Sequence, residues 1–321
     1  MNRAAFFSNR AVVLGLAVLC CLLWGSAYPA IKNGFALFGI VPQDIAGKLV
    51  FAGWRFTFSG LLLLGLVLVM NPSGLRLSLR DTGELTLLGL TQTGLQYGFF
   101  YVGLAYTTGV KGSILNATST FFSALLAHAL YRNDRLSINR VLGCVIGFAG
   151  VVIANFNRDL QDFEFTFMGD GFVVITAFIF SAAAIYGKRI SQRMDSMAMT
   201  GYQLIIGGVA LTVVGSIYGG TLQNFTLIST SLLIYLVLVS SATFSLWSLL
   251  LKYNRVGVVT VYSFLIPVFG GMSSALFLNE SILDLRNATA LIAVCYGIWL
   301  VTREKPAAQQ EVAAPAMAGK R

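Results

Sequence analysis

Long apolar stretches separated by short polar segments dominate this chain. A helix needs about 20 mostly apolar residues to cross the hydrocarbon core of a bilayer. Ten stretches of that kind cover residues 11–31, 49–70, 85–106, 112–130, 138–156, 169–187, 199–219, 229–251, 256–278 and 283–302. The pattern therefore predicts an all-α membrane protein with ten transmembrane helices. The first stretch lacks a small-residue cleavage site, so we interpret it as a retained helix and not as a signal peptide.

The composition excludes a water-soluble fold. Hydrophobic residues make up 56% of the 321 residues and charged residues only 11%, against roughly 45–50% and about 25% in soluble globular chains. The net charge of +9 does not indicate nucleic-acid binding, because Lys and Arg are dispersed among short loops and form no basic face. The four cysteines lie in apolar runs without a CxxC pair, so we expect neither a metal site nor a cofactor.

The distribution of Lys and Arg predicts the orientation. If the N-terminus is cytoplasmic, 16 of the 22 basic residues fall on the inner side. Arg55 lies within a predicted span, and the outer side holds Lys32, Lys48, Lys111, Arg158 and Arg286. This excess follows the positive-inside rule. We therefore expect a multi-pass protein of the inner (plasma) membrane with both termini in the cytoplasm.

The two halves of the chain resemble each other at a nearly constant offset. "WRFTFSGLLLL" from Trp54 matches "YQLIIGGVAL" from Tyr202, and "GV" at Gly109 matches "GV" at Gly257, both at an offset of 148. "ALYRND" from Ala129 matches "ALFLNE" from Ala275 at an offset of 146. Each half holds five predicted helices, an odd number, so the second half must lie inverted in the membrane. Inverted repeats of this kind are a transporter architecture with the substrate site between the repeats.

The repeat fixes the predicted domain organisation. A cytoplasmic segment, 1–10, precedes the first repeat, 11–156, and an outer loop, 157–168, leads to the second repeat, 169–302. A cytoplasmic tail, 303–321, rich in Ala, Gln and Pro, is predicted to be disordered. A ten-helix unit encloses a complete site, so a monomer in the lipid bilayer is the default expectation.

Several motifs resemble the EamA-type transporters of the drug/metabolite transporter superfamily. They are "LLWGSAYPAIKNGF" from Leu22, "AGWRFTFSGLLLL" from Ala52, the run from Gly103 to Ile153, and "LIPVFGGMSSALFLNESI" from Leu265. The resemblance covers about residues 14–301 and departs from the pattern in the first repeat, where Phe121 stands in place of Pro267 and Asp134 in place of Glu280. It implies two five-helix EamA repeats and an inner-membrane secondary transporter, often an exporter of amino acids or related metabolites.

Carboxylates are missing from the interior of the predicted spans, since all 13 Asp and Glu fall in loops, helix ends or tails. A buried carboxylate would be the usual proton relay. Its absence argues against export of organic cations and against carboxylate-based proton coupling. Facilitated exchange and coupling through another group both stay open.

Polar and aromatic positions within the spans supply candidate substrate-binding residues. Trp24 and Tyr28 share one helix face with Lys32, and Pro29 should interrupt that helix and free backbone carbonyls. The alternative is a kinked helix whose Tyr and Lys anchor the outer interface. Arg55, the one charge placed within a span, either holds a substrate carboxylate or a gate carbonyl, or snorkels to the outer interface.

Further candidates come from both repeats. Gln92, Gln96 and Tyr101 in the third span, with Asn116 in the fourth, either line a wet cavity or hold helices together. Trp247 either lines the cavity or faces lipid, while Tyr262 and the hinge residue Pro267 are expected to belong to the second half of the cavity. His128, the only histidine, is either a proton sensor or an ordinary hydrogen-bonded residue.

These patterns predict a secondary transporter and no catalytic residues. A membrane enzyme would need a set of His and carboxylates that this chain lacks, and a channel would show a filter sequence or rings of charge. We expect a small-molecule substrate, an amino acid or related compound, moved by alternating access with efflux as the direction. Nucleobases, sugars or drugs are the alternative cargo.

Overall fold

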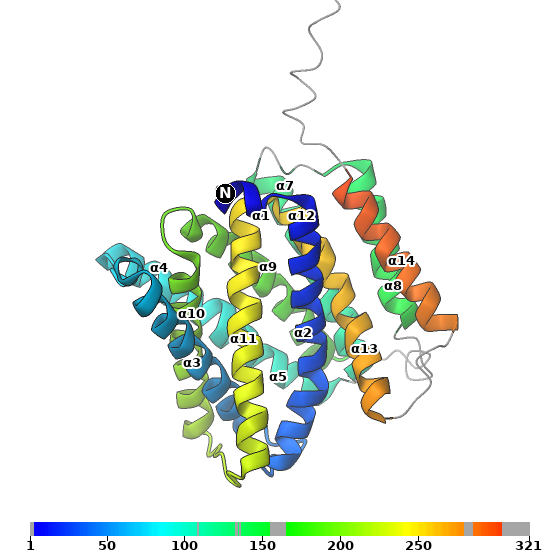
Figure 1. The fold of residues 1–321 in the computed structure, drawn as a ribbon. Helices are drawn as coiled ribbons and strands as arrows, with labels where there is room; N and C mark the ends of the chain where they lie inside the picture. Colours follow the sequence, from blue (N-terminus) through cyan, green and yellow to red (C-terminus); the bar gives the residue numbers. More distant parts are fainter. Residues whose placement is uncertain are drawn as a thin grey trace, which may run out of the picture.

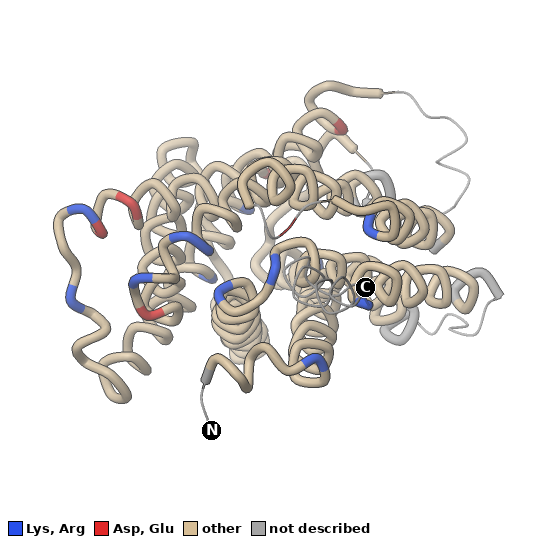
Figure 2. The backbone as a smooth tube through the Cα atoms, turned by 90° about the horizontal axis from the view of Figure 1, so that it is seen from above, with Lys and Arg blue, Asp and Glu red and all other residues tan. Residues whose placement is uncertain are grey.

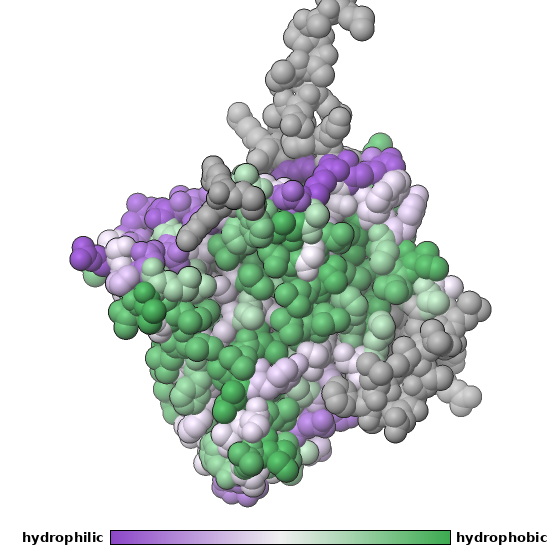
Figure 3. Space-filling model, in the orientation of Figure 1, coloured by the Kyte–Doolittle hydropathy of each residue, from purple (hydrophilic) through white to green (hydrophobic). Residues whose placement is uncertain are grey.

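The computed structural model describes residues 3–107, 109–131, 134, 136–154, 165–278 and 285–303, and these residues form helices and no strands. The predicted tail beyond residue 303 and most of the predicted loop 157–168 lie outside the described residues. Figure 1 shows a bundle in which most helices run roughly along one direction. On the face shown in Figure 3, a hydrophobic band covers the bundle between hydrophilic rims at the two ends.

Among the described residues, five helical stretches are long and apolar enough to cross a membrane, and four of them are single α-helices: α2 (Arg10–Leu37), α3 (Ile45–Met70), α10 (Ser196–Ile217) and α11 (Leu227–Tyr253). The fifth runs from a π-helical turn, Phe167–Gly171, into α9 (Phe172–Ser191). All five coincide with predicted spans, so the chain is a multi-pass membrane protein. Lys and Arg lie mainly at helix ends and in connecting segments on the side viewed in Figure 2.

The other predicted spans fall on shorter or interrupted helices, so the count of ten spans stays a prediction. The third span is α4 (Leu79–Leu88) and α5 (Gln96–Tyr106) joined by a π-helical turn, Gly89–Leu95. The fourth divides at Thr118 into α6 (Gly109–Ala117) and α7 (Ser119–Leu130). The ninth divides into α12 (Val256–Thr260), a 3-10 turn, Val261–Phe264, and α13 (Leu265–Leu278). The remaining helices are α1 (Arg3–Phe7), α8 (Ile138–Ala154) and α14 (Leu285–Thr302), with a 3-10 turn at Pro72–Leu75.

Corresponding helices of the two halves make corresponding contacts, in agreement with a two-repeat layout. The helices α3 and α10 occupy the same place in each half and pack against each other, as do α8 and α14. In the first half α2 packs against α11 and α13, and in the second half α9 packs against α5 and α7. Figure 1 shows the α8–α14 pair at one side of the bundle.

Glycines allow the close approach of α3 and α10. A Cβ added to Gly60 would lie 2.5 Å from the Gly201 carbonyl oxygen, and one added to Gly53 would lie 2.7 Å from the Gly208 carbonyl oxygen. Small residues at helix contacts serve this purpose in membranes, where the hydrophobic effect does not drive helices together. The contact fixes the helix that carries Arg55 against the second half.

Candidate functional site

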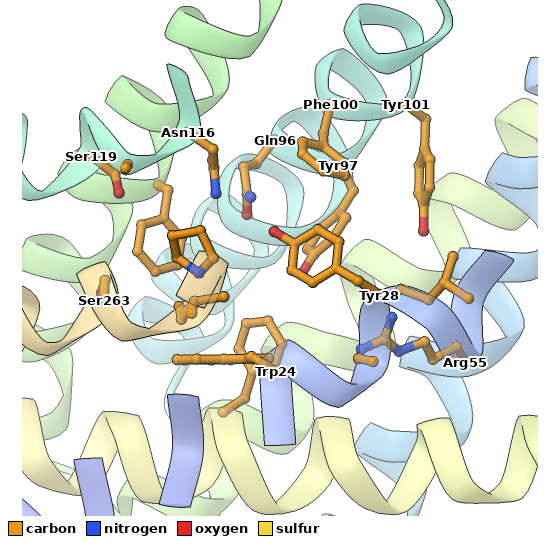
Figure 4. Close-up of a pocket in the computed structure, with 17 residues that line it drawn as sticks. Trp24, Tyr28, Arg55, Gln96, Tyr97, Phe100, Tyr101, Asn116, Ser119 and Ser263 are labelled. Carbon is orange, nitrogen blue, oxygen red and sulfur yellow. The ribbon is translucent and has the colours of Figure 1, made fainter. Parts of the chain in front are cut away.

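Most of the predicted binding residues line one cavity of about 120 Å³, which we call the large cavity. Seven predicted residues are among those that line it: Trp24, Tyr28, Arg55, Gln96, Tyr101, Asn116 and Pro267. They come from α2, α3, α5, α6 and α13, so segments from both halves of the chain contribute. Figure 4 shows their side chains converging on one space.

A second, smaller cavity of about 10 Å³, the small cavity, lies next to the first. Gln92 and Trp247, two further predicted residues, line it together with Lys188, Ser248 and Leu251. Trp24, Phe180 and Phe244 line both cavities. The predicted residues are therefore divided between two spaces that share a wall.

The order of lining residues shows that the two cavities are stacked along the helices. On α2 the residues after Trp24 line only the large cavity, and on α11 the residues after Phe244 line only the small one. The same order holds in α9, where Phe180 touches both cavities and Lys188 only the small one, and in the third span, where Gln92 precedes Gln96. The predicted orientation places the small cavity on the cytoplasmic side.

Aromatic rings form the wall between the cavities. The ring of Trp24 lies 5.0 Å from that of Trp247 and 5.8 Å from that of Phe244, both in edge-on arrangements. Such pairs are typical of stable aromatic packing. We call Trp24, Phe244 and Trp247 the aromatic partition. Trp247 is 3% exposed, so the alternative in which it faces lipid is wrong.

Arg55 lies buried in the wall of the large cavity, with 2% of its surface exposed. Its Nε donates a hydrogen bond of 2.6 Å to Ser240 Oγ, and its guanidinium carbon lies 5.1 Å from the centre of the Phe56 ring. The alternative in which Arg55 snorkels to the interface is therefore wrong. In the part of the chain that the structure describes, its Nη1 has no hydrogen-bond partner, and no ion pair involves it.

Gln96 provides a second unsatisfied polar atom in the same cavity. Its side chain is 7% exposed, and Oε1 has no hydrogen-bond partner among the described residues. Figure 4 shows the amides of Gln96 and Asn116 on one side of the cavity and the guanidinium of Arg55 on the other, with the Tyr28 ring between. A buried polar group without a partner costs free energy, roughly 1–3 kcal/mol. The cavity wall thus contains one unpartnered charged donor and one unpartnered acceptor.

Two predicted residues lie outside both cavities. Tyr262 is buried in the apolar core, where its carbonyl oxygen accepts a hydrogen bond of 3.2 Å from Cys21 Sγ, so its placement in the cavity wall is wrong. Pro29 lines neither cavity and does not interrupt its helix, because α2 continues through it to Leu37. Its ring nitrogen carries no hydrogen, so the carbonyl of Gly25, four residues earlier, lacks its usual helical donor.

Pro267 lies where the ninth span changes geometry, immediately after the 3-10 turn that ends at Phe264. A proline at this position leaves the carbonyl of Ser263 without its usual helical donor, and Ser263 also lines the large cavity. Lys32, which was placed on the same helix face as Trp24 and Tyr28, is exposed and lines neither space.

His128 behaves as a hydrogen-bonded structural residue. Its Nδ1 accepts a hydrogen bond of 3.1 Å from the backbone N–H of Leu136, which requires that nitrogen to be unprotonated. Among the described residues, no group of three or more His, Cys, Asp or Glu side chains is placed to hold a metal ion.

Sequence reasoning missed several residues that complete the cavity walls. Phe180 and Ile266 lie in mostly apolar stretches and Phe244 lies among Ser and Thr, so no local signal separates these three from residues that face lipid or core. Ser119 also lines the large cavity. Its polarity inside an apolar span was the available signal, and the serine hydroxyl is too common in helix packing to mark a site.

Comparison with known proteins assigns the family. The EamA-like transporter family matches the sequence twice, over residues 12–156 and 167–303. The chain is 28% identical to the uncharacterized transporter YvbV of Bacillus subtilis, over 94% of this chain and 93% of that protein. It is 27% identical to an uncharacterized transporter of Archaeoglobus fulgidus, over 90% and 97% of the two chains. A solved crystal structure shares the fold, with a TM-score of 0.75 at 18% identity over 92% of this chain and 97% of that one.

Proposed function

The chain belongs to the EamA-like transporter family, and we propose that it carries a small carboxylate-bearing metabolite, an amino acid or a related compound, by alternating access. Proteins of this family are transporters and not enzymes, so the binding residues hold and release a substrate without changing it. The substrate site is the large cavity, and the aromatic partition separates it from the small cavity.

The observation that carries the proposal is the state of Arg55. A guanidinium inside a membrane-spanning bundle costs about 2.5–3.5 kcal/mol on insertion scales, and this one has only Ser240 and the Phe56 ring as recorded partners among the described residues. A carboxylate would supply the missing charge and accept a hydrogen bond from Nη1. Charge-assisted pairs of this kind are the strong ones in proteins.

The other side of the cavity supports a donor group on the same substrate. Gln96 Oε1 needs a hydrogen-bond donor, and the rings of Tyr28, Tyr97 and Phe100 surround the space between the amide and the guanidinium. An ammonium, hydroxyl or amide group of a small metabolite would fit this acceptor. A substrate with an acid at one end and a donor at the other therefore satisfies both unpaired atoms.

The proposed direction is efflux across the inner membrane, with both termini in the cytoplasm. The excess of Lys and Arg on the predicted inner side supports this orientation. In that orientation the aromatic partition closes the cytoplasmic side of the large cavity, and the structure corresponds to the outward-facing state of the cycle.

Counterflow in proteoliposomes tests the proposal. Vesicles preloaded with an unlabelled amino-acid mixture should take up labelled amino acid in a saturable manner that depends on the internal load. Carboxylate compounds should compete, whereas the amides of the same compounds, which match them in size, should not. Equal competition by acid and amide would contradict the role of Arg55.

The same assay separates the alternatives. Counterflow of nucleobases, sugars or drugs without any response to amino acids would show a carrier with a different cargo. Uptake that neither saturates nor depends on the internal load would indicate a channel. Acceleration by an imposed pH gradient would show proton coupling through a group other than a carboxylate inside a span.

A further inference from the structure

Asp134 joins the two halves of the protein through a buried contact. Its Oδ1 accepts a hydrogen bond of 2.6 Å from Arg140 Nη1, and its Oδ2 accepts one of 3.1 Å from the backbone N–H of Gly257. Asp134 and Arg140 are 2% and 3% exposed. A buried ion pair is strongly coupled to its surroundings, because removal of one member leaves the other charge uncompensated.

This contact holds one end of a segment that lines the large cavity. Gly257 is the second residue of α12, and the same segment continues through a 3-10 turn to Ser263 and Pro267 in the cavity wall. One turn beyond Gly257, Thr120 Oγ1 donates a hydrogen bond of 3.3 Å to the Thr260 carbonyl oxygen. Thr120 of α7 and Asp134, both in the first half, thus join the start of α12 on the side away from Arg55.

The sequence carries the same three residue types at corresponding positions of the other half. Glu280 corresponds to Asp134 and Arg286 to Arg140, both at an offset of 146, and Gly109 corresponds to Gly257 at an offset of 148. The side chains of Glu280 and Arg286 lie outside the described residues, so the structural argument rests on Asp134, Arg140 and Gly257 alone. The repetition sets this trio apart from an incidental surface ion pair.

We propose that Asp134, Arg140 and Gly257 form a latch. The latch closes the small cavity toward the cytoplasm and must open in each transport cycle. The proposal rests on the alternating access proposed above. While Asp134 holds the N-terminal end of α12, that helix stays packed against α7. When the carboxylate leaves the Gly257 N–H, α12 is free to move, and the small cavity gains a path to the cytoplasm.

Asp170 offers a matched control, because it is as buried as Asp134 but lies in the π-helical turn that precedes α9. It is 1% exposed and accepts hydrogen bonds from Thr107 Oγ1 at 2.5 Å and from the Thr166 N–H at 3.0 Å. Asp170→Asn removes a buried charge without touching α12. Any general loosening of the fold caused by losing a buried carboxylate should appear in both variants.

The experiment measures how fast a cysteine in the small cavity reacts from the cytoplasmic side. Ser248→Cys is introduced into a chain without native cysteines, and a charged, membrane-impermeant methanethiosulfonate is added to inside-out vesicles. Asp134→Asn should raise the reaction rate roughly tenfold or more, the change expected when the closed state loses a charge-assisted hydrogen bond. Asp170→Asn should leave the rate unchanged.

Equal rates in Asp134→Asn and the parent would overturn the latch, and so would an equal increase in Asp170→Asn. If Asp134→Asn does not accumulate as folded protein, Thr120→Val decides, since it removes the neighbouring α7–α12 hydrogen bond. An increase of about twofold would support the latch, and no change would overturn it. The assay uses no substrate, so its outcome is independent of whether counterflow identifies amino acids as cargo.

Discussion

The large and small cavities share a wall but differ in what they offer a substrate. The large cavity holds Arg55 and Gln96, each with an unpartnered polar atom among the described residues, and aromatic rings surround it. In the small cavity, Lys188 Nζ already donates to the carbonyl oxygen of Asn254, and Trp247 Nε1 is a neutral donor without a partner among the described residues. A charged donor that faces an acceptor distinguishes the large cavity, which is the proposed substrate site, from the small cavity, which is the proposed closed half of the pathway.

The largest expected effect comes from removing the charge of the large cavity. Arg55→Gln should raise the KM for a carboxylate substrate about 10- to 150-fold, because a hydrogen bond to a charged group contributes roughly 1.5–3 kcal/mol. Arg55→Lys, which keeps the charge but loses the planar fork, should fall between that variant and the parent. Counterflow kinetics measure all three, and an unchanged KM in Arg55→Gln would remove Arg55 from the site.

The next effect concerns the helix contact that fixes Arg55 in place. A Cβ at Gly60 would lie 2.5 Å from the Gly201 carbonyl oxygen, whereas one at Gly65, on the same helix α3, meets nothing within 4 Å. Gly60→Ala should therefore destabilise the protein by about 1–3 kcal/mol. Gly65→Ala is the control and should be neutral or slightly stabilising. Thermal unfolding of the purified variants measures both effects. An equal shift of the unfolding temperature in the two variants would contradict the prediction.

Two glutamines of one helical segment allow the same substitution in each cavity. Gln96→Leu should weaken substrate binding several-fold, since a neutral hydrogen bond contributes about 0.5–1.5 kcal/mol. Gln92→Leu alters the small cavity and should leave the KM measured from the outer side unchanged. Uptake kinetics in right-side-out vesicles distinguish the two. A larger effect of Gln92→Leu would mean that the roles of the two cavities are reversed.

The smallest effect is expected outside the membrane, where α4 meets the α9–α10 loop. Hydrogen bonds from Ser78, with the nearby Arg193, hold the pKa of Asp81 below its ordinary value, and Arg193 does the same for Glu84. Groups with a lowered pKa stabilise the fold above the unfolded-state pKa and lose that contribution as the pH falls through the folded-state value.

Arg193→Gln should therefore lower thermal stability slightly at neutral pH. The variant should also lose less stability than the parent as the pH falls. Unfolding curves recorded from neutral pH down to the range of the folded carboxyl pKa values measure this difference. If the stabilities of the parent and the variant differed by the same amount at every pH, the contact would make no electrostatic contribution to stability. Arg193→Gln should leave the KM unchanged, because Arg193, Asp81 and Glu84 line neither cavity.

The sequence was sufficient to predict where the long helices lie and several of the polar residues that line the cavities. Arg55, Gln96 and Asn116 were identifiable because polar side chains are costly inside spans. The division of these residues between two cavities was not predictable, since Gln92 and Gln96 lie four positions apart and look equivalent. A π-helical turn at Gly89–Leu95 directly precedes Gln96, and no residue pattern predicts this turn.

Other features were invisible for different physical reasons. Tyr262 lies near Pro267 in sequence, but the 3-10 turn at Val261–Phe264 directs it into the core. Asp134 was read as part of a charged loop, and its burial depends on Gly257 in the other half of the chain. Contacts between segments so distant in sequence follow from tertiary packing, which periodicity and composition do not encode.

The most direct test of the account is the side from which the large cavity is reached. Ser263 lines that cavity, so a Ser263→Cys variant in a chain without other cysteines reports on its access to an impermeant thiol reagent. We predict rapid modification in right-side-out vesicles, slowed by a carboxylate substrate and not by its amide, and slow modification in inside-out vesicles. Modification only from the cytoplasmic side, or equal protection by acid and amide, would contradict an outward-facing site organised around Arg55.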